Sequence, residues 1–358
     1  MSDKILIIQD EGYKKWISEL KQRYKISQIK AAVKVNSELL HFYWLLGRDI
    51  AILYKKALWG SSFYDSLAKD LQDAFPDSKG FSPRNLRYMK KFYCLFSEQN
   101  ASNDNAVSGN REILPQVGAK IFDIPWNHIK AIMDKCDEDS NMAMFYIDET
   151  IKNNWSRAVL LNFLDTNLYE RQGKAISNFE ASLPKAGSAL AQEITKDPYN
   201  FDFLTIREDY DESELKKALI NNIQKFLLEL GTGFAFVGKE YRLSVGDTEQ
   251  FTDLLFYNIR IHAYVVIEVK ITEFEPSYVG QLGTYCVAVD HILKSEKDEK
   301  TIGLLVCKHK DDVVAKYALE SSSQPIGVSA YQLSNLIPED FKSSLPTIEE
   351  IEAELNEK

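Results

Sequence analysis

The stretch Phe251-Thr252-Asp253-Leu254-Leu255-Phe256-Tyr257, followed by Tyr264-Val265-Val266-Ile267-Glu268-Val269-Lys270, decides the fold of the second half of this chain. Both segments are rich in β-branched and aromatic residues, as strands are, and the short polar segment 258–262 between them predicts a hairpin turn. Side chains alternate across a strand, so Glu268 and Lys270 share one face, and pairing through the turn brings Asp253 near Glu268. The two strands therefore gather two carboxylates and a lysine.

These three side chains suit metal-dependent hydrolysis of a phosphodiester. Asp253 and Glu268 offer hard oxygen ligands for Mg²⁺, or for Mn²⁺ in its place, and Mg²⁺ takes its remaining ligands from water and substrate phosphate. The metal activates water and neutralises charge on phosphorus, while Lys270 holds the attacking water or stabilises the anionic transition state. The alternative is an exposed ion pair at a strand end, which such residues form in many proteins.

The elements around these strands follow a definite order. An apolar stripe at three- and four-residue steps predicts a helix over 214–230, which Gly231 ends. We further expect a strand over 234–245, a turn at Gly246-Asp247, a helix over 276–293 entered at Pro276, a buried strand over 301–307, a short helix over 311–319 and an edge strand over 326–331. The order is helix, three strands, helix, strand.

This order, with Asp on the second strand and Glu-x-Lys on the third, resembles the PD-(D/E)XK nuclease superfamily. The stretches 226–238, 252–257 and Gly280-Gln281-Leu282 are similar to the YhcG-type nuclease domain. The resemblance implies a restriction-endonuclease-like α/β domain with a mixed central sheet, in which Asp253 and Glu268 bind metal and Lys270 is catalytic. Thr252 replaces the proline that gives the superfamily its name, and that proline carries no chemistry.

The resemblance also implies accessory residues. Gln281 and Tyr285 lie four residues apart on the expected helix and so share a face. The superfamily often places a glutamine or tyrosine there, in contact with phosphate or the reaction centre, so we include Gln281 among the catalytic residues; a solvated helix face is the alternative. Some relatives carry an additional acid where Glu214 stands, although an acid in a first helical turn also stabilises the helix dipole.

The charge distribution indicates a second role for the N-terminal half. The first 100 residues contain 17 Lys or Arg against 11 Asp or Glu, whereas the whole chain has a net charge of -10. A basic end on an acidic chain indicates contact with nucleic acid by one part of the protein.

The basic residues include a candidate recognition helix. The sequence predicts a helix over 62–75, a turn over 76–80, and a second helix that Ser82 caps and Pro83 begins. Four cations lie on overlapping faces of this second helix: Arg84, Arg87, Lys90 and Lys91. This pattern is typical of a helix-turn-helix that follows phosphates and reaches bases, and a solvated basic face on a bundle helix is the alternative.

Further stretches, including Tyr43-Trp44 and 80–86, look like the helical N-terminal domain of YhcG-like proteins. We therefore expect an α+β protein. Its expected parts are an all-α N-terminal domain over 1–185 with a candidate helix-turn-helix and a flexible loop near 97–112, a connecting segment over 186–210, the nuclease domain over 211–345 and an acidic tail over 346–358.

Taken together, these patterns predict a cytoplasmic, Mg²⁺-dependent deoxyribonuclease, most simply an endonuclease, acting on DNA that is branched or otherwise structured. No apolar stretch approaches the roughly 20 residues that cross a bilayer, and no signal-peptide pattern opens the chain. The net negative charge suggests that a homodimer or a partner protein assists DNA binding. The alternative is an inactive nuclease fold used for nucleic acid binding or complex assembly. Sequence patterns leave DNA against RNA, and endo- against exonuclease action, open.

Overall fold

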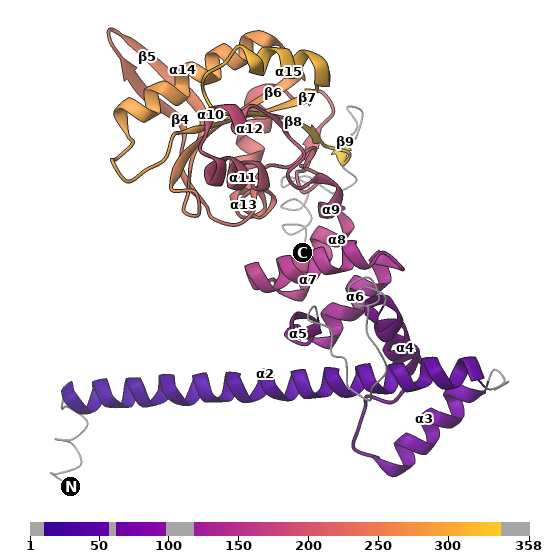
Figure 1. The fold of residues 1–358 in the computed structure, drawn as a ribbon. Coiled ribbons are helices and arrows are strands. Elements are labelled where there is room, and N and C mark those ends of the chain that lie inside the picture. Colours follow the sequence, from indigo (N-terminus) through magenta and orange to yellow (C-terminus); the bar gives the residue numbers. More distant parts are fainter. Residues whose placement is uncertain (1–10, 57–61, 98–117, 338–358) are drawn as a thin grey trace, which may run out of the picture. The chain divides into compact units, whose positions relative to one another are not determined.

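The structure is a computed structural model that describes residues 11–56, 62–97 and 118–337 (Figure 1). The chain forms two compact units, Met1–Tyr169 and Glu170–Lys358. The first is helical and the second combines a mixed sheet with helices, so the predicted α+β class is confirmed. The predicted acidic tail, and the predicted loop apart from Ser97, lie outside the described residues.

The helical unit is built around α4. Its helices are α2 (Glu11–Lys56), α3 (Phe63–Ala74), α4 (Pro83–Ser97), α5 (Gly118–Ile121), α6 (Trp126–Cys136), α7 (Ser140–Asn153), α8 (Arg157–Asp165) and α9 (Leu168–Arg171), the last of which crosses the boundary between the units. Helix α4 starts as predicted, because the Asn85 N–H donates to Ser82 Oγ at 3.2 Å. Phe92 of α4 is fully buried and meets Trp44 and Trp126 edge to face. Gly47 lets α2 approach closely, since a Cβ there would lie 2.0 Å from the Met89 carbonyl oxygen.

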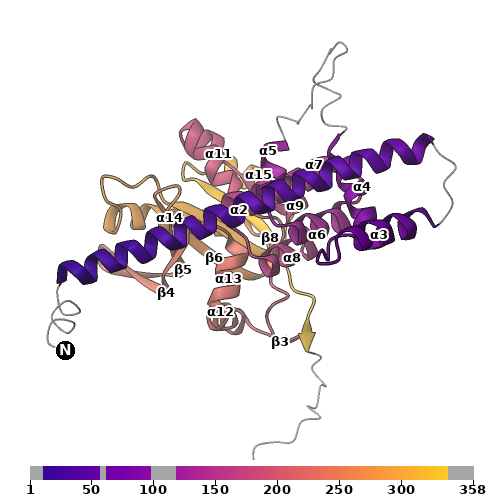
Figure 2. The same ribbon diagram turned by 90° about the horizontal axis from the view of Figure 1, so that it is seen from below.

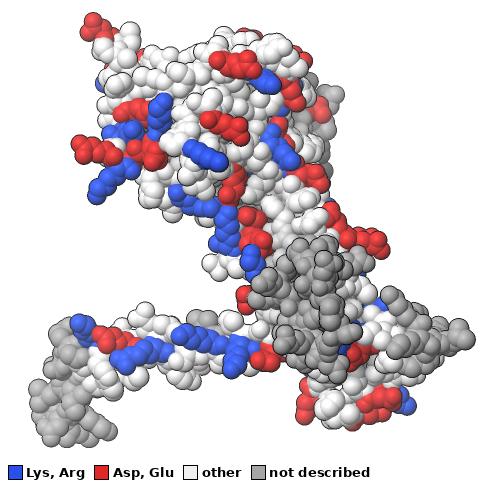
Figure 3. All heavy atoms as spheres, in the orientation of Figure 1, with Lys and Arg blue, Asp and Glu red and all other residues white. Residues whose placement is uncertain are grey.

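Helix α2 is a single continuous helix in both ribbon views (Figures 1 and 2). Over residues 13–28 every side chain is exposed except Ile17, which is half-buried. Lys and Arg side chains lie along this part of the helix, as Figure 3 shows. No helix within the described ranges has both the length and the apolar character needed to span a bilayer.

The second unit contains the sheet. Its elements are β1 (Ile176–Ser177), α10 (Phe179–Ser182), α11 (Lys185–Glu193), β2 (Tyr199–Asn200), β3 (Ile206–Arg207), α12 (Glu212–Asn221), α13 (Ile223–Leu230), β4 (Phe234–Val245), β5 (Thr248–Asn258), β6 (Ala263–Glu273), α14 (Pro276–Ile292), β7 (Ile302–His309), α15 (Asp312–Glu320), β8 (Ile326–Gln332) and β9 (Leu336–Ile337). The strand order is β1-β8-β7-β6-β5-β4, and β2 also pairs with β8. Strands β4, β5 and β6 are antiparallel, while β6, β7 and β8 are parallel, so the predicted mixed sheet is confirmed.

Two apolar layers cover the sheet. Leu254 and Ile267 pack with α12 and α13 on one face, whereas Leu255 and Val266 pack with α14 and α15 on the other. Adjacent residues of one strand thus enter opposite layers, as strand alternation requires. Figure 1 shows α14 and α15 above the sheet and α11 and α13 below it. Glu268 and Lys270 alternate in phase with Val266 and therefore belong to the α14 face.

Two local predictions differ from the structure. The helix expected over 214–230 is broken at Asn222, whose side-chain amide donates to the Ala218 carbonyl at 3.0 Å and caps α12 before α13 begins. Strand β8, expected at the edge, lies inside the sheet between β7 and β1. The strand that pairs with the outer side of β8 lies far upstream in the sequence. The residues of β8 alone therefore do not indicate that this strand is interior.

The division between the units also differs from the expected boundary after residue 185. Strand β1 pairs with β8, and Phe179 of α10 is buried in the layer below the sheet. The buried pair of Arg171 and Glu229, 2.5 Å apart, joins the start of this unit to α13. The segment 170–210, expected to be helical domain and connector, is thus part of the unit that holds the sheet.

Candidate active site

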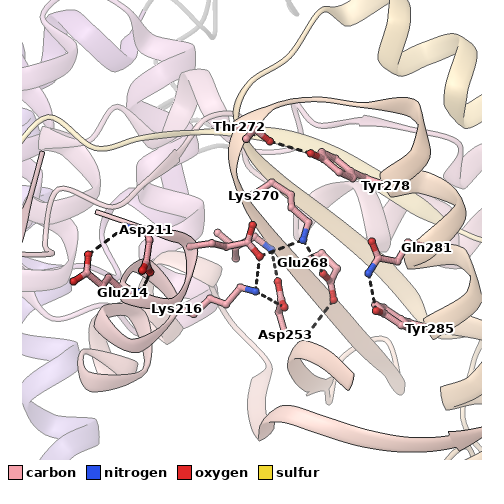
Figure 4. Close-up of polar contacts among 12 residues, drawn as sticks. Asp211, Glu214, Lys216, Asp253, Glu268, Lys270, Thr272, Tyr278, Gln281 and Tyr285 are labelled. Carbon is pink, nitrogen blue, oxygen red and sulfur yellow. Dashed lines mark hydrogen bonds and ion pairs between the residues drawn. The ribbon is translucent and has the colours of Figure 1, made fainter. Parts of the chain in front are cut away.

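The candidate active site lies where β5 and β6 stop pairing. Their backbone pairing runs from Asn258 and Ala263 to Leu254 and Ile267, next to Asp253 and Glu268. At this end the Asp253 N–H donates to Glu268 Oε1 at 3.1 Å, and the Val269 N–H donates to Asp253 Oδ2 at 3.1 Å. Each carboxylate therefore accepts a backbone N–H of the neighbouring strand, and the two acids lie side by side (Figure 4).

Lys270 is two residues further along β6 and faces the same way as Glu268. Its Nζ lies 3.6 Å from Glu268 Oε2 and donates to Glu212 Oε1 at 3.3 Å. The ammonium also lies 5.6 Å from the ring centroid of Tyr278, whose hydroxyl is 3.0 Å from Thr272 Oγ1. The three residues predicted from the sequence are thus brought together.

A second lysine joins the site from α12. Lys216 Nζ donates to Asp253 Oδ1 at 2.5 Å and to Glu212 Oε1 at 2.7 Å (Figure 4). Neither Glu212 nor Lys216 was predicted from the sequence. The available signal was an acid and a lysine four residues apart at the start of a helix, on one face.

Glu214 is not brought to the site. Its carboxylate accepts the Asp211 N–H at 3.2 Å, and its own N–H donates to Asp211 Oδ1 at 2.7 Å, which together form a capping box. Glu214 is exposed, and Glu212, which lies two residues earlier and so on a different face of the helix, provides the acidic group instead. Helix capping and the apolar stripe fix which way each acid points.

Burial and neighbouring charges shift the pKa of the acid and of the two lysines at this site. Burial and the adjacent Asp253 carboxylate raise the pKa of Glu268, which is only 3% exposed. Burial disfavours the charged form of Lys216, but its contacts with Asp253 and Glu212 outweigh this effect and raise its pKa. The pKa of Lys270 is raised in the same way, against burial, by the surrounding carboxylates. Both lysines therefore stay cationic, while Glu268 is a buried acid that a further cation would stabilise.

The donor set fits a divalent cation of the magnesium type. Asp253 and Glu268 supply two carboxylates, and no larger group of His, Cys, Asp and Glu suited to a metal occurs in the described parts of the chain. Mg²⁺ is commonly held by one or two carboxylates together with water and phosphate oxygens. The raised pKa of Glu268 is consistent with a site that favours added positive charge.

Helix α14 contributes a polar pair on the same face of the sheet. Gln281 Nε2 donates to the Tyr285 hydroxyl at 2.7 Å. Figure 4 shows this pair on the helix beside Glu268. As predicted, the two residues share a face of α14, and their contact fixes the orientation of the Gln281 amide.

The four predicted nucleic-acid-binding residues of α4 belong to the helical unit and have different surroundings. Arg84 Nη2 lies 3.5 Å from the Tyr88 hydroxyl, and the Arg87 guanidinium lies 4.8 Å from the ring centroid of Tyr64. Lys91 forms an ion pair with Asp137 at 3.0 Å. Arg84 and Arg87 are exposed, whereas Lys90 and Lys91 are half-buried. These cations do not form one uniform basic face.

A mixed sheet with Asp on its second long strand and Glu-x-Lys on the third defines the PD-(D/E)XK nuclease class. Residues 192–346 match the YhcG PDDEXK nuclease domain, and residues 19–171 match the DUF1016 N-terminal domain. Each half of the chain therefore belongs to a known domain family, and the second half is a YhcG-type PDDEXK nuclease domain. The chain is 29% identical over 322 residues to the Escherichia coli (strain K12) protein named "Putative nuclease YhcG", with 84% of each chain covered.

Solved structures are also similar in part. A repair endonuclease from Pyrococcus abyssi is 18% identical over 36% of this chain and 50% of its own, with a TM-score of 0.24. EndoMS in a complex with double-stranded DNA is 21% identical over 36% of this chain and 49% of its own, with a TM-score of 0.25. The chain thus spans about half the length of these structures.

Proposed function

We propose that this protein is a metal-dependent nuclease that hydrolyses phosphodiester bonds in DNA, as a cytoplasmic endonuclease. The observation that carries the proposal is the reciprocal bonding of Asp253 and Glu268 where β5 and β6 stop pairing, with Lys270 on the same face. Membership of a nuclease family supports the same chemistry. DNA as the substrate follows from the resemblance to the superfamily.

In this proposal the side chains of the site have distinct roles. Asp253 and Glu268 would hold Mg²⁺, or Mn²⁺ in its place, and the bound ion would activate water and neutralise charge on the phosphate. Lys270, held between Glu268 and Glu212, orients the attacking water and stabilises negative charge in the transition state. Gln281, oriented by Tyr285, contacts a phosphate oxygen.

The charge balance of the site supports the need for a cation. Glu212, Asp253 and Glu268 face the ammonium groups of Lys216 and Lys270. When all five groups are ionised, one negative charge is left uncompensated, which repels a phosphodiester. A divalent ion reverses the sign of the site and makes it complementary to the single charge of that substrate.

Substrate delivery by the helical unit is part of the proposal. The exposed Arg84 and Arg87 of α4 would contact phosphates, with Lys90 and Lys91 behind them. Because the chain as a whole is acidic, binding depends on such local cations. Branched or otherwise structured DNA, and assembly as a homodimer or with a partner protein, would each compensate for weak long-range attraction.

One contact favours a second candidate function. Lys216 lies 2.5 Å from Asp253 and already neutralises a proposed metal ligand. A protein in which this ion pair is permanent would keep the nuclease fold without activity and act in nucleic acid binding or complex assembly.

The test is incubation of the full chain with linear, single-stranded and branched DNA and with RNA, with and without Mg²⁺ or Mn²⁺. We expect metal-dependent cleavage of DNA that Lys270→Ala removes and that Lys239→Ala, a change at an exposed lysine of β4, leaves intact. Metal-dependent cleavage that survives Lys270→Ala would contradict the mechanism. Binding without cleavage of any substrate would favour the second candidate.

A further inference from the structure

The helical unit contains a polar groove between α4, α6 and α8. Its volume is about 480 Å³. Four cationic side chains line it: Arg84 from α4, Lys130 and Lys135 from α6, and Arg157 from α8. Two acids, Asp134 and Asp165, also line it, so cations are in excess.

The cations of the groove are available to an external anion. Among the described residues none forms an ion pair with Lys130, Lys135 or Arg157. Asp134, by contrast, accepts hydrogen bonds from the Tyr88 hydroxyl at 2.7 and 2.9 Å, through its two carboxylate oxygens. Asp134 keeps its negative charge in this contact, so the four cations and two acids leave the lining with a formal charge of +2.

Tyr88 also brings two cations together. The Arg84 guanidinium lies 5.7 Å and the Lys130 ammonium 5.9 Å from the centroid of its ring. Such contacts favour cations beside an aromatic face. Arg84 also donates one hydrogen bond to the Tyr88 hydroxyl at 3.5 Å, and the remaining donors of its guanidinium can serve an anion in the groove.

Backbone groups at the rim of the groove also favour anions. The groove includes first-turn residues of all three helices, Asn85 of α4, Asn127 of α6 and Arg157 of α8. The N-terminal ends of helices carry partial positive charge, which favours anions. The partial charge of the three helix ends adds to the positive charge of the side chains and requires no conformational change.

The chemistry of the lining selects the class of ligand. Sites for small organic molecules are concave and mostly apolar, whereas this groove is lined largely by charged and amide side chains. Arg84, Lys135 and Arg157 are exposed, so a long ligand can pass across them. Repeated phosphates on an extended chain match cations contributed by three separate helices.

We propose that this groove binds the phosphodiester backbone of nucleic acid, with Arg84, Lys130 and Arg157 as its main contacts. Phosphate binding then centres on the groove rather than along α4, where Arg87 lies over Tyr64 and Lys91 is paired with Asp137. The identity of the ligand rests on the proposed nuclease function. The binding step itself involves no residue of the metal site.

The test measures binding of fluorescently labelled single- and double-stranded DNA to the full chain in EDTA, by anisotropy over a range of KCl concentrations. The double variant Lys130→Ala/Arg157→Ala should weaken binding about tenfold or more and reduce the slope of log affinity against log salt by roughly 2, because each phosphate contact contributes about one unit. The matched control is Lys69→Ala/Lys79→Ala, which removes two exposed lysines of the same unit that do not line the groove.

The outcomes are distinct. An unchanged slope in Lys130→Ala/Arg157→Ala, or an equal fall in the control, would overturn the groove as the binding site. Thermal melting followed by circular dichroism should show both variants folded, since no ion pair is removed, and Lys130→Gln/Arg157→Gln provides a second neutral variant if the first unfolds. If the protein binds DNA through the groove but cleaves no substrate with Mg²⁺ or Mn²⁺, the proposed nuclease function is refuted, whereas the proposed DNA binding by the groove is supported.

Discussion

The nuclease site and the groove of the helical unit use cationic side chains in opposite ways. At the nuclease site Lys216 and Lys270 each contact two carboxylates, and both lie in a partly buried setting. In the groove, Lys130, Lys135 and Arg157 have no carboxylate partner among the described residues. A lysine already paired with acids offers little net attraction to phosphate, whereas an unpaired one offers its full charge. Under the proposed function, the candidate active site therefore needs a metal before it accepts phosphate, whereas the groove does not.

The largest expected effect comes from removing a proposed metal ligand. Asp253→Asn or Glu268→Gln should lower the rate of cleavage by roughly a thousandfold or more, because the stabilisation that a metal gives amounts to several kcal/mol. DNA binding in EDTA should be unchanged, since the groove retains all its cations. Rates come from gel assays and affinities from anisotropy. A parallel loss of binding in these variants would remove the contrast between the two regions.

Lys270→Ala should have the next largest effect, about a hundredfold to a thousandfold on kcat, as removal of one stabilising donor does in other enzymes. The metal ligands stay in place, so binding of Mn²⁺ measured by calorimetry should persist. Lys239→Ala is the control for loss of a lysine elsewhere in the sheet. Loss of Mn²⁺ binding in Lys270→Ala would show that this lysine supports the ligands rather than the reaction.

Lys216→Met tests whether the paired lysine competes with metal. Its ammonium contacts Asp253, so its removal should strengthen Mn²⁺ binding roughly tenfold, the size expected from about one partly exposed ion pair. Lys217→Met, at an exposed neighbouring position of α12, should change the affinity little. Weaker Mn²⁺ binding in Lys216→Met would mean that Lys216 helps to build the metal site, contrary to the comparison above.

Gln281→Ala should have the smallest effect, a three- to tenfold fall in kcat, because a single neutral hydrogen bond contributes about 1 kcal/mol. Tyr285→Phe removes the hydroxyl that accepts from Gln281 and should cause a smaller fall of the same kind. DNA affinity in EDTA should match that of the unaltered protein in both variants. An unaffected kcat in Gln281→Ala would remove this residue from the proposed mechanism.

Elements with a strong local pattern were predicted closely from the sequence. Strand β4 has the predicted bounds, Pro276 begins α14, and the turn at Gly246 lies where expected, with a left-handed backbone that glycine adopts freely. The approach of Asp253 to Glu268 also followed from a short hairpin, because turn length fixes which residues of two strands meet. These features depend on interactions between residues near one another in the chain.

Features that depend on distant segments were not predicted, such as the interior position of β8, which depends on β1. The break at Asn222 was also not predicted, although its cap is local, because the apolar stripe continues across it. The choice of Glu212 over Glu214 depends on how α12 packs against the sheet.

The sequence by itself determined the alternation of β5 and β6, the presence of Asp253, Glu268 and Lys270 on neighbouring strands, and the cap that begins α4. Only the tertiary structure decided which cations are paired. Lys216 of α12 is paired with Asp253 of β5, while Lys130 and Arg157 line one groove with Arg84 and form no ion pair among the described residues. Strand alternation and helix capping are short-range geometric rules, whereas the pairing of charges depends on which surfaces the packed elements bring together.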